Sequence, residues 1–341
     1  MRIELSPDRL AALDQPDSSL RNDIAAVLRS VVHGWETVGP ISVTRLHGGQ
    51  SNTIFACSRG TTPADNVILR IYGDGLDAFF ARDEELHIFE LIAGLNLGLG
   101  LLGKFENGRA ESFIPGRPLT AMDLREPSLC EKIARKFSIF HGVNLPIDKS
   151  PRVLATIDEW FAQAAVMTTP RPVDMRAIAD GIARLKGYAA RVDSPVVFCH
   201  NDLNCSNIML SGHEVIFIDF EYSHYNPRGF DLGNHFAEWC YFMHGPPVET
   251  PDVAMYPTVD DQRRFCRAYL NEKATPDAVE ALRLEANVYA LAAHLYWATW
   301  AIVQSPKSTP DFNYFEYSMG RWSLFLAQEA SVVSALEQRL D

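Results

Sequence analysis

The 341-residue sequence lacks several patterns that would place it in common classes of protein. Its six cysteines form no C-x-x-C pair, so zinc ribbons and thioredoxin-type redox sites lack their spacing. No run of about 18 apolar residues occurs, and the N-terminus has no apolar signal region. With a net charge of −12 and no cluster of Lys and Arg, the chain also lacks the signature of a nucleic-acid-binding protein. We therefore expect a soluble, cytoplasmic protein that neither inserts into a membrane nor binds nucleic acid.

The composition is that of an ordinary globular protein, with 47% hydrophobic and 22% charged residues. The acidic balance suits a cationic substrate, but solubility explains it equally well. The length is sufficient for two lobes, each with its own core.

Patterning along the chain predicts an α+β fold with a small antiparallel-sheet lobe and a larger, mainly helical lobe. Strand-like segments alternate with turns from about residue 40 to 115, and one helix, 77–94, follows the third strand. The proline- and glycine-rich stretch 115–118 predicts a linker, so the lobes comprise residues 1–115 and 116–341. Beyond the linker, helices are expected at 119–143, 154–167, 172–191, 229–243, 259–271, 276–304 and 311–337, with a strand-rich insert at 195–220.

The centre of the chain holds the densest group of chemically useful residues. His200, Asp202 and Asn207 follow the spacing H-x-D-x-x-x-x-N, which is typical of a kinase catalytic loop. In such a loop the aspartate accepts the substrate's hydroxyl proton and the asparagine holds Mg²⁺. The apolar strand 215–218 presents Asp219 as a second ligand, and Mg²⁺ needs few protein ligands because it also binds ATP phosphates and water. The pattern predicts phosphoryl transfer from ATP, with Asp202 as the catalytic base.

Some of these polar residues could have a structural role, such as capping a turn or a helix, instead of a catalytic one. An aspartate such as Asp202 can simply cap a turn, but that explanation does not account for the placement of Asn207 and Asp219. Asp231 opens a helix, so we favour N-terminal capping over direct catalysis. Glu238, two helical turns further on, is a candidate for the acceptor site.

Candidate ATP-binding residues lie in the strand-rich region. Gly48, Gly49, Ser51 and Asn52 occupy a strand–turn–strand setting, where successive N–H groups can bind phosphate. Two glycines also make an ordinary hairpin turn, and the absence of Gly-Lys-Ser/Thr excludes a Walker A loop.

Arg70 lies midway along an apolar strand, where kinases keep a cation for the ATP phosphates. We expect it to pair with Glu85, or with Glu84, although an edge-strand arginine that faces solvent is the alternative. Position alone recommends Glu111, Phe113 and Ile114, which precede the linker where a hinge would offer backbone groups to adenine.

Trp297 and Trp300 share one helix face, and Tyr314 and Tyr317 follow on the next helix. Aromatic faces stabilise an ammonium by cation–π attraction, worth about 0.5–2 kcal/mol each. For an isolated W-x-x-W pair, core packing is the favoured explanation.

Taken together, these motifs resemble those of the choline/ethanolamine kinases, within the group of aminoglycoside-phosphotransferase-like and protein-kinase-like folds. The resemblance runs from about residue 40 to the C-terminus. The matching segments are 48–52, 69–73, 111–115, 200–207, 218–223, 229–236 and 297–304.

The resemblance implies ATP- and Mg²⁺-dependent phosphorylation of the hydroxyl of choline or ethanolamine, the entry step of phosphatidylcholine and phosphatidylethanolamine synthesis. It implies Asp202 as base and Asn207 and Asp219 as Mg²⁺ ligands. It places Glu238, Trp297, Trp300 and Tyr317 around a small cationic amino alcohol, against the core-packing alternative. A homodimer is a further implication.

The sequence gives conflicting indications of the preferred amino alcohol. Leu203, after the aspartate, favours the ethanolamine branch, whereas segment 229–231 and Trp239 favour the choline branch. Met243 stands where a further cage tyrosine is expected in choline kinases. We therefore predict a kinase of dual or undecided preference.

Two other functions compete with this one. An aminoglycoside or other small-alcohol phosphotransferase would share the fold, but its acceptor site is typically acidic and open, without the aromatic pair. A pseudokinase scaffold would lack one of Asp202, Asn207 or Asp219, and all three are present.

Overall fold

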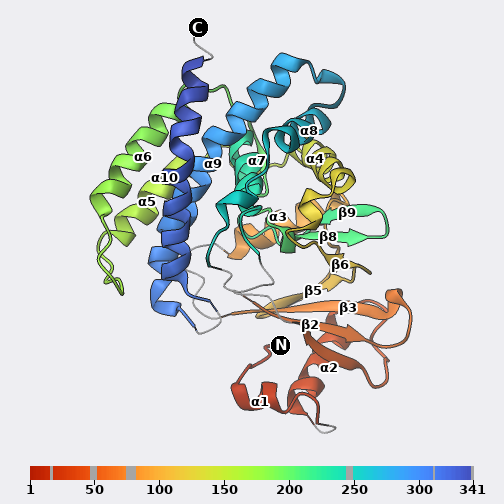
Figure 1. Cartoon of the computed structure of the whole chain (residues 1–341). Coiled ribbons are helices and arrows are strands. Elements are labelled where there is room, and N and C mark those ends of the chain that lie inside the picture. Colours follow the sequence, from red (N-terminus) through yellow and green to blue (C-terminus); the bar gives the residue numbers. More distant parts are fainter. Residues whose placement is uncertain (16–17, 47–51, 74–81, 243–248, 310–311, 339–341) are drawn as a thin grey trace. The chain divides into compact units, whose positions relative to one another are not determined.

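The computed structural model describes residues 1–15, 18–46, 52–73, 82–242, 249–309 and 312–338. The chain divides into two compact units, Met1–Gly116 and Arg117–Asp341. Each is described separately below, and Figure 1 gives the course of the chain. None of the helices in the described segments combines the length and apolar content that a bilayer span requires.

The first unit is built on a five-stranded antiparallel sheet in the order β1-β2-β3-β5-β4. Its strands are β1 (Ser42–Leu46), β2 (Asn52–Ser58), β3 (Asn66–Tyr72), β4 (Leu101–Phe105) and β5 (Gly108–Ser112). Helix α3 (Arg82–Gly94) lies between β3 and β4 in sequence. The predicted order of strands, with one helix after the third, is confirmed.

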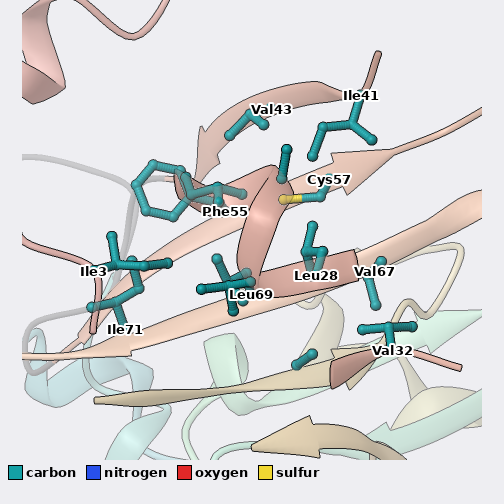
Figure 2. Close-up of a cluster of buried hydrophobic side chains, with 14 of the residues drawn as sticks. Ile3, Leu28, Val32, Ile41, Val43, Phe55, Cys57, Val67, Leu69 and Ile71 are labelled. Atoms are coloured by element: carbon teal, nitrogen blue, oxygen red, sulfur yellow. The ribbon is translucent and has the colours of Figure 1, made fainter. Parts of the chain in front are cut away.

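The N-terminal segment forms the hydrophobic backing of this sheet. Helices α1 (Pro7–Ala11) and α2 (Ser19–Val31) both begin at a serine whose side chain accepts a backbone N–H, as helix N-caps do. Leu20, Ile24 and Leu28 of α2 are buried in a core that extends over the inward side chains of β2 and β3 (Figure 2). Burial of this apolar stripe is what holds the segment on the sheet.

Two backbone details fix that segment further. The Asn107 side chain donates to Ile3 O and accepts from Ile3 N, at 2.8 and 2.9 Å, as a neighbouring strand would. At Gly103 in β4, an added Cβ would lie 2.2 Å from Val31 O, so only glycine allows α2 to approach this strand so closely.

The second unit is mainly helical, with α9 at its centre, packed against α5, α7, α8 and α10. Its helices are α4 (Pro127–His141), α5 (Val153–Ala164), α6 (Met175–Ala189), α7 (Arg228–Glu238), α8 (Val259–Leu270), α9 (Pro276–Gln304) and α10 (Tyr314–Gln338). Helix α9 starts where the sequence predicted, because Thr275 caps Ala278 N and Pro276 takes a first-turn position. Figure 1 shows α7 and α10 beside α9 within this unit.

Two small antiparallel sheets complete the second unit. Strands β6 (Arg117–Pro118), β8 (Ile208–Ser211) and β9 (Glu214–Phe217) form one, and β7 (Val196–Cys199) pairs with β10 (His224–Pro227) in the other. Strand β10 was not predicted, because its His-Tyr-Asn-Pro sequence has no strand-like alternation.

Helices α7 and α9 are in contact at backbone level. A Cβ at Gly233 would lie 2.4 Å from Ala286 O and from Ala290 N, so no other residue permits this approach without displacing a helix. The contact sets the position of residues further along α7 relative to the aromatic residues of α9.

All six cysteines are free and buried. Burial raises the pKa of Cys57, Cys130 and Cys240 to about 12 and that of Cys205, within the catalytic loop, to about 11. Protonated thiols of this kind are poor nucleophiles.

Candidate active site

The catalytic loop leaves β7 at Cys199 and ends in a short 3₁₀ turn, Cys205–Asn207. The Asn207 amide nitrogen donates to the backbone oxygen of Asp202 at 2.8 Å and to its carboxylate at 3.0 Å. Asn204 donates to the other Asp202 oxygen at 3.3 Å and also caps the turn through Ser206 N. The loop therefore brings Asp202 and Asn207 together, and it fixes the orientation of the carboxylate.

Asp202 lies in a concentration of negative charge. Burial, together with the carboxylates of Glu238, Glu221 and Asp219, raises the pKa of Asp202 well above its ordinary value. Each of these groups disfavours the ionised form, so a bound cation stabilises the ionised cluster. A cluster of this composition is suited to bind metal ions or an ammonium.

Asp219 follows β9 and has a left-handed backbone conformation, with φ of 66°. Asn201, beside the catalytic aspartate, has φ of 67°. Such conformations cost non-glycine residues roughly 1–3 kcal/mol and concentrate at functional sites. The strand that presents Asp219 is tied to the catalytic loop, since Ile218 N donates to Asn207 O at 3.0 Å.

The donor set fits Mg²⁺. Within the described residues both hydrogen bonds of the Asn207 side-chain amide use its nitrogen, so its carbonyl oxygen is the atom that could bind a metal ion. A carboxylate at Asp219 and an amide oxygen at Asn207 are hard oxygen ligands of the kind that Mg²⁺ prefers.

Asp231 anchors the loop rather than capping a helix. Its carboxylate accepts from the backbone N–H groups of His200 and Asn201, at 2.7 and 2.8 Å, and lies 3.0 Å from His141 Nε2. The N-cap of α7 is Pro227, which makes no side-chain cap, so the expected capping role is wrong. The local sequence favoured a cap, but the true partners lie 30, 31 and 90 residues away along the chain.

His200 braces the catalytic loop against the segment that follows β9. Its Nε2 lies 2.9 Å from Ile218 O, and its ring contacts Phe140 and Phe220. Burial lowers the pKa of His200, so the ring is neutral and serves as a spacer between loop and strand.

Aromatic residues on and beside α9 and α10 form a continuous row of ring contacts. Successive ring centroids lie 4.8–5.5 Å apart. In order, the row runs Tyr222, Trp297, Trp300, Tyr314, Phe312, Tyr317 and Tyr241. Trp297 is buried and donates to Asn234 Oδ1 at 2.8 Å, whereas Trp300 is partly exposed. Burial raises the pKa of the Tyr222 phenol, and the charges of Glu221 and Asp202 raise it further.

Glu238, the candidate acceptor-site carboxylate, forms an ion pair with Arg321 of α10. Arg321 also donates to the hydroxyl of Tyr317, from Nε at 2.9 Å and from Nη2 at 2.6 Å. The sequence analysis did not identify Arg321. Its position four residues after Tyr317 on a helix was the available signal.

In the first unit, the prediction that Arg70 pairs with Glu85 is wrong, because Arg70 pairs with Glu111 instead. Arg70 Nε donates to Glu111 at 3.0 Å, and Arg109 donates to Glu111 at 2.7 Å and to Glu85 at 2.8 Å. Arg70 faces Arg109 across β3 and β5, so one sheet face carries both cations. Arg70 is buried, which excludes the solvent-facing alternative.

Glu111 therefore uses its carboxylate inside the sheet, while its backbone pairs with both neighbouring strands. Sequence reasoning placed it at an adenine-binding hinge and did not find Arg109. Arg109 also stacks on Phe89 of α3, 4.2 Å from the ring centroid. The signal was the alternation of Arg109 and Glu111 on one strand face.

Other predicted residues remain untested. Gly48, Gly49 and Ser51 lie outside the described residues, as does Met243. Asn52 opens β2 opposite Tyr72, and Phe113 and Ile114 follow β5, partly buried.

An antiparallel sheet unit, a helical unit, and a catalytic loop that holds Asp202 and Asn207 and is hydrogen-bonded to the residue before Asp219 define a protein-kinase-like phosphotransferase. The sequence model of the choline/ethanolamine kinase family matches residues 43–326. The chain belongs to that family and is an ATP-dependent kinase.

Individual relatives support the same family. Choline/ethanolamine kinases of Rattus norvegicus and Homo sapiens are each 36% identical to the chain; the alignments cover 89% and 88% of it and 84% of each relative. The crystal structure of a choline kinase from Cryptosporidium parvum superposes with a TM-score of 0.81 at 23% identity, covering 92% of this chain and 96% of that one. It shows the shared fold. Family membership does not favour an aminoglycoside phosphotransferase or a pseudokinase.

Proposed function

We propose that this protein transfers the γ-phosphoryl group of ATP to the hydroxyl of choline and of ethanolamine, which yields phosphocholine and phosphoethanolamine. The observation that carries the proposal is the proximity of an oriented base to a row of aromatic rings, together with family membership. The base serves phosphoryl transfer to an alcohol, and the rings suit an ammonium.

Asp202 acts as the catalytic base. Burial, and then the surrounding carboxylates, raise the pKa of Asp202 and so its proton affinity, which favours uptake of the proton from the acceptor hydroxyl. Asn207 and Asn204 hold the carboxylate in one orientation, so the acceptor oxygen can be aligned with the phosphorus atom.

Asn207 and Asp219 would hold Mg²⁺, which when bound neutralises phosphate charge. The loop anchored by Asp231 and the strand that presents Asp219 keep these two oxygen donors close to Asp202. Their role is to hold the metal site and the base in one rigid arrangement.

In the first unit, Arg70 would contact the ATP phosphates. Its guanidinium is oriented by Glu111, which Arg109 holds in turn, so the cation has a defined position. Gly48, Gly49, Ser51 and Asn52 are further candidates for the phosphates, and Phe113 and Ile114 for adenine.

The ammonium of the substrate would bind against Trp297, Trp300 and Tyr317, near Glu238. Aromatic faces can bind both quaternary and primary ammonium groups, whereas a carboxylate accepts hydrogen bonds only from the primary one. A site that offers both kinds of contact supports activity on both amino alcohols.

A substrate panel tests the proposal. ADP release is measured with choline, ethanolamine, and the mono- and dimethyl derivatives of ethanolamine, with kanamycin as the aminoglycoside control. We expect turnover with the amino alcohols and none with kanamycin. Turnover with kanamycin alone would replace the proposal by the aminoglycoside alternative.

The family resemblance also supports a homodimer, and the six buried free thiols suit the reducing cytoplasm. Light scattering during size-exclusion chromatography measures the oligomeric state. Fractionation of the source cells tests the cytoplasmic location.

A further inference from the structure

Arg321 is the buried cation of the second unit that lies within the aromatic row. Its side chain is fully buried between α7 and α10, and its guanidinium carbon lies 4.3 Å from the Tyr241 ring centroid and 5.0 Å from that of Tyr317. The protein's own cation therefore occupies ring faces of the kind that the substrate ammonium would use.

Two residues accept hydrogen bonds from this guanidinium. Nη2 donates to Glu238 and to the Tyr317 hydroxyl, and Nε donates to the same hydroxyl, while Nη1 makes no hydrogen bond within the described residues. Arg321 thus ties a carboxylate of α7 to a phenol of α10. Each of the three side chains restricts the rotamers of the other two.

The ion pair also changes the charge of the site. Glu238 is one of the carboxylates that raise the pKa of Asp202, so it lies near the base. Arg321 opposes its charge at close range, and the nearby His294 adds no cation, because burial foremost and then Arg321 itself lower its pKa to about 3. An ammonium beside Glu238 meets an oriented carboxylate whose charge is largely balanced.

From this geometry we infer that Arg321 is a positioning residue that sets substrate preference, an inference that rests on the proposed function. It holds Glu238 in one orientation for directional hydrogen bonds from a primary ammonium. A quaternary ammonium has no N–H to donate and depends on the rings. The rigid carboxylate therefore matters more for ethanolamine than for choline.

The test compares wild type with Arg321→Lys, which keeps the charge but cannot donate to both partners in one plane. The double variant Glu238→Gln/Arg321→Met removes the pair without leaving a buried lone charge, in case the single variant does not fold. A matched control is Arg184→Met, which breaks the partly exposed Arg184–Glu329 pair between α6 and α10, away from the site. Amine Kd is measured by calorimetry and KM by ADP release.

We expect Arg321→Lys to raise the Kd and KM of ethanolamine about tenfold, equivalent to about 1.4 kcal/mol, and those of choline less. The KM of ATP and the values of the control should stay within about twofold of wild type. The double variant should likewise raise the Kd and KM of ethanolamine more than those of choline.

Equal loss for both amines, or a parallel loss for ATP, would overturn the inference and leave Arg321 a structural residue only. Unchanged amine constants in both variants would do the same. If wild type binds the amines without turning them over, the proposed function fails, yet the Kd comparison still tests Arg321.

Discussion

Replacement of Asp231 by asparagine tests the anchoring of the catalytic loop. The carboxylate accepts two backbone N–H groups and pairs with His141 Nε2, all within 3.0 Å. An ionised carboxylate only accepts, so Nε2 carries a proton, and Tyr269 lies 2.9 Å from the other ring nitrogen. Asparagine keeps one acceptor oxygen but turns an NH₂ group toward a donor.

The expected loss follows from these contacts. A hydrogen bond to a charged acceptor contributes roughly 1.5–3 kcal/mol, and a buried donor left unpaired costs about 1–3 kcal/mol. One bond lost and two weakened give a decrease in the free energy of unfolding of roughly 3–5 kcal/mol. For a unit of this size that corresponds to a Tm decrease of roughly 6–20 °C.

The same residue predicts a pH dependence. Burial opposes ionisation, but His141 and the His200 N–H outweigh it and lower the pKa of Asp231 below its ordinary value. Because the pKa is lower in the folded state, ionised Asp231 stabilises the fold at pH values above the unfolded pKa of about 3.9. This stabilisation is lost as the pH falls through the folded-state pKa. The difference between wild type and Asp231→Asn should hold from about pH 5 to 8 and shrink below about pH 4.

Thermal unfolding followed by circular dichroism, from pH 3 to 8, measures both effects. Asp158→Asn is the control, since it breaks an exposed pair with Lys186 and should cost at most about 1 kcal/mol. If Asp231→Asn matches wild type at pH 7, or keeps its full deficit at pH 3, the anchoring argument is refuted.

Three further predictions concern catalysis and binding. Asp202→Asn and Asp219→Asn should each lower kcat by orders of magnitude without unfolding the protein; retention of more than roughly a tenth of wild-type kcat in Asp219→Asn excludes it as a metal ligand. Arg70→Ala should raise the KM of ATP far more than that of the amine, with only partial rescue by Arg70→Lys, and an unchanged ATP KM would remove Arg70 from the phosphate site. Trp300→Ala should lower kcat/KM for choline roughly tenfold more than for ethanolamine, and an equal effect on both would make the tryptophan a shape-forming residue only.

The sequence predicted elements best where the signal was local. Helix α9 was predicted with its true bounds because Thr275 and Pro276 mark its start and apolar residues continue along it. The catalytic loop was identified because the spacing of its functional residues is short and chemically specific.

Contacts between residues far apart in the sequence could not be predicted from local patterns. Glu111 lies 41 residues from Arg70, and only the β3–β5 register brings the two side chains to one sheet face. Arg321 was not identified from the sequence, since its ion pair with Glu238 depends on how α7 and α10 pack around α9. Such contacts follow from tertiary packing, which no local pattern encodes.

The burial of every native cysteine makes this chain well suited to site-specific fluorescent labelling. Maleimide dyes react with accessible thiolates, and these thiols are shielded and protonated near neutral pH. Cysteines introduced at Leu95, 49% exposed in the first unit, and Val166, 85% exposed in the second, would therefore carry dyes without removal of any native residue. Energy transfer between the two dyes would then report the distance between the units in solution, with and without nucleotide.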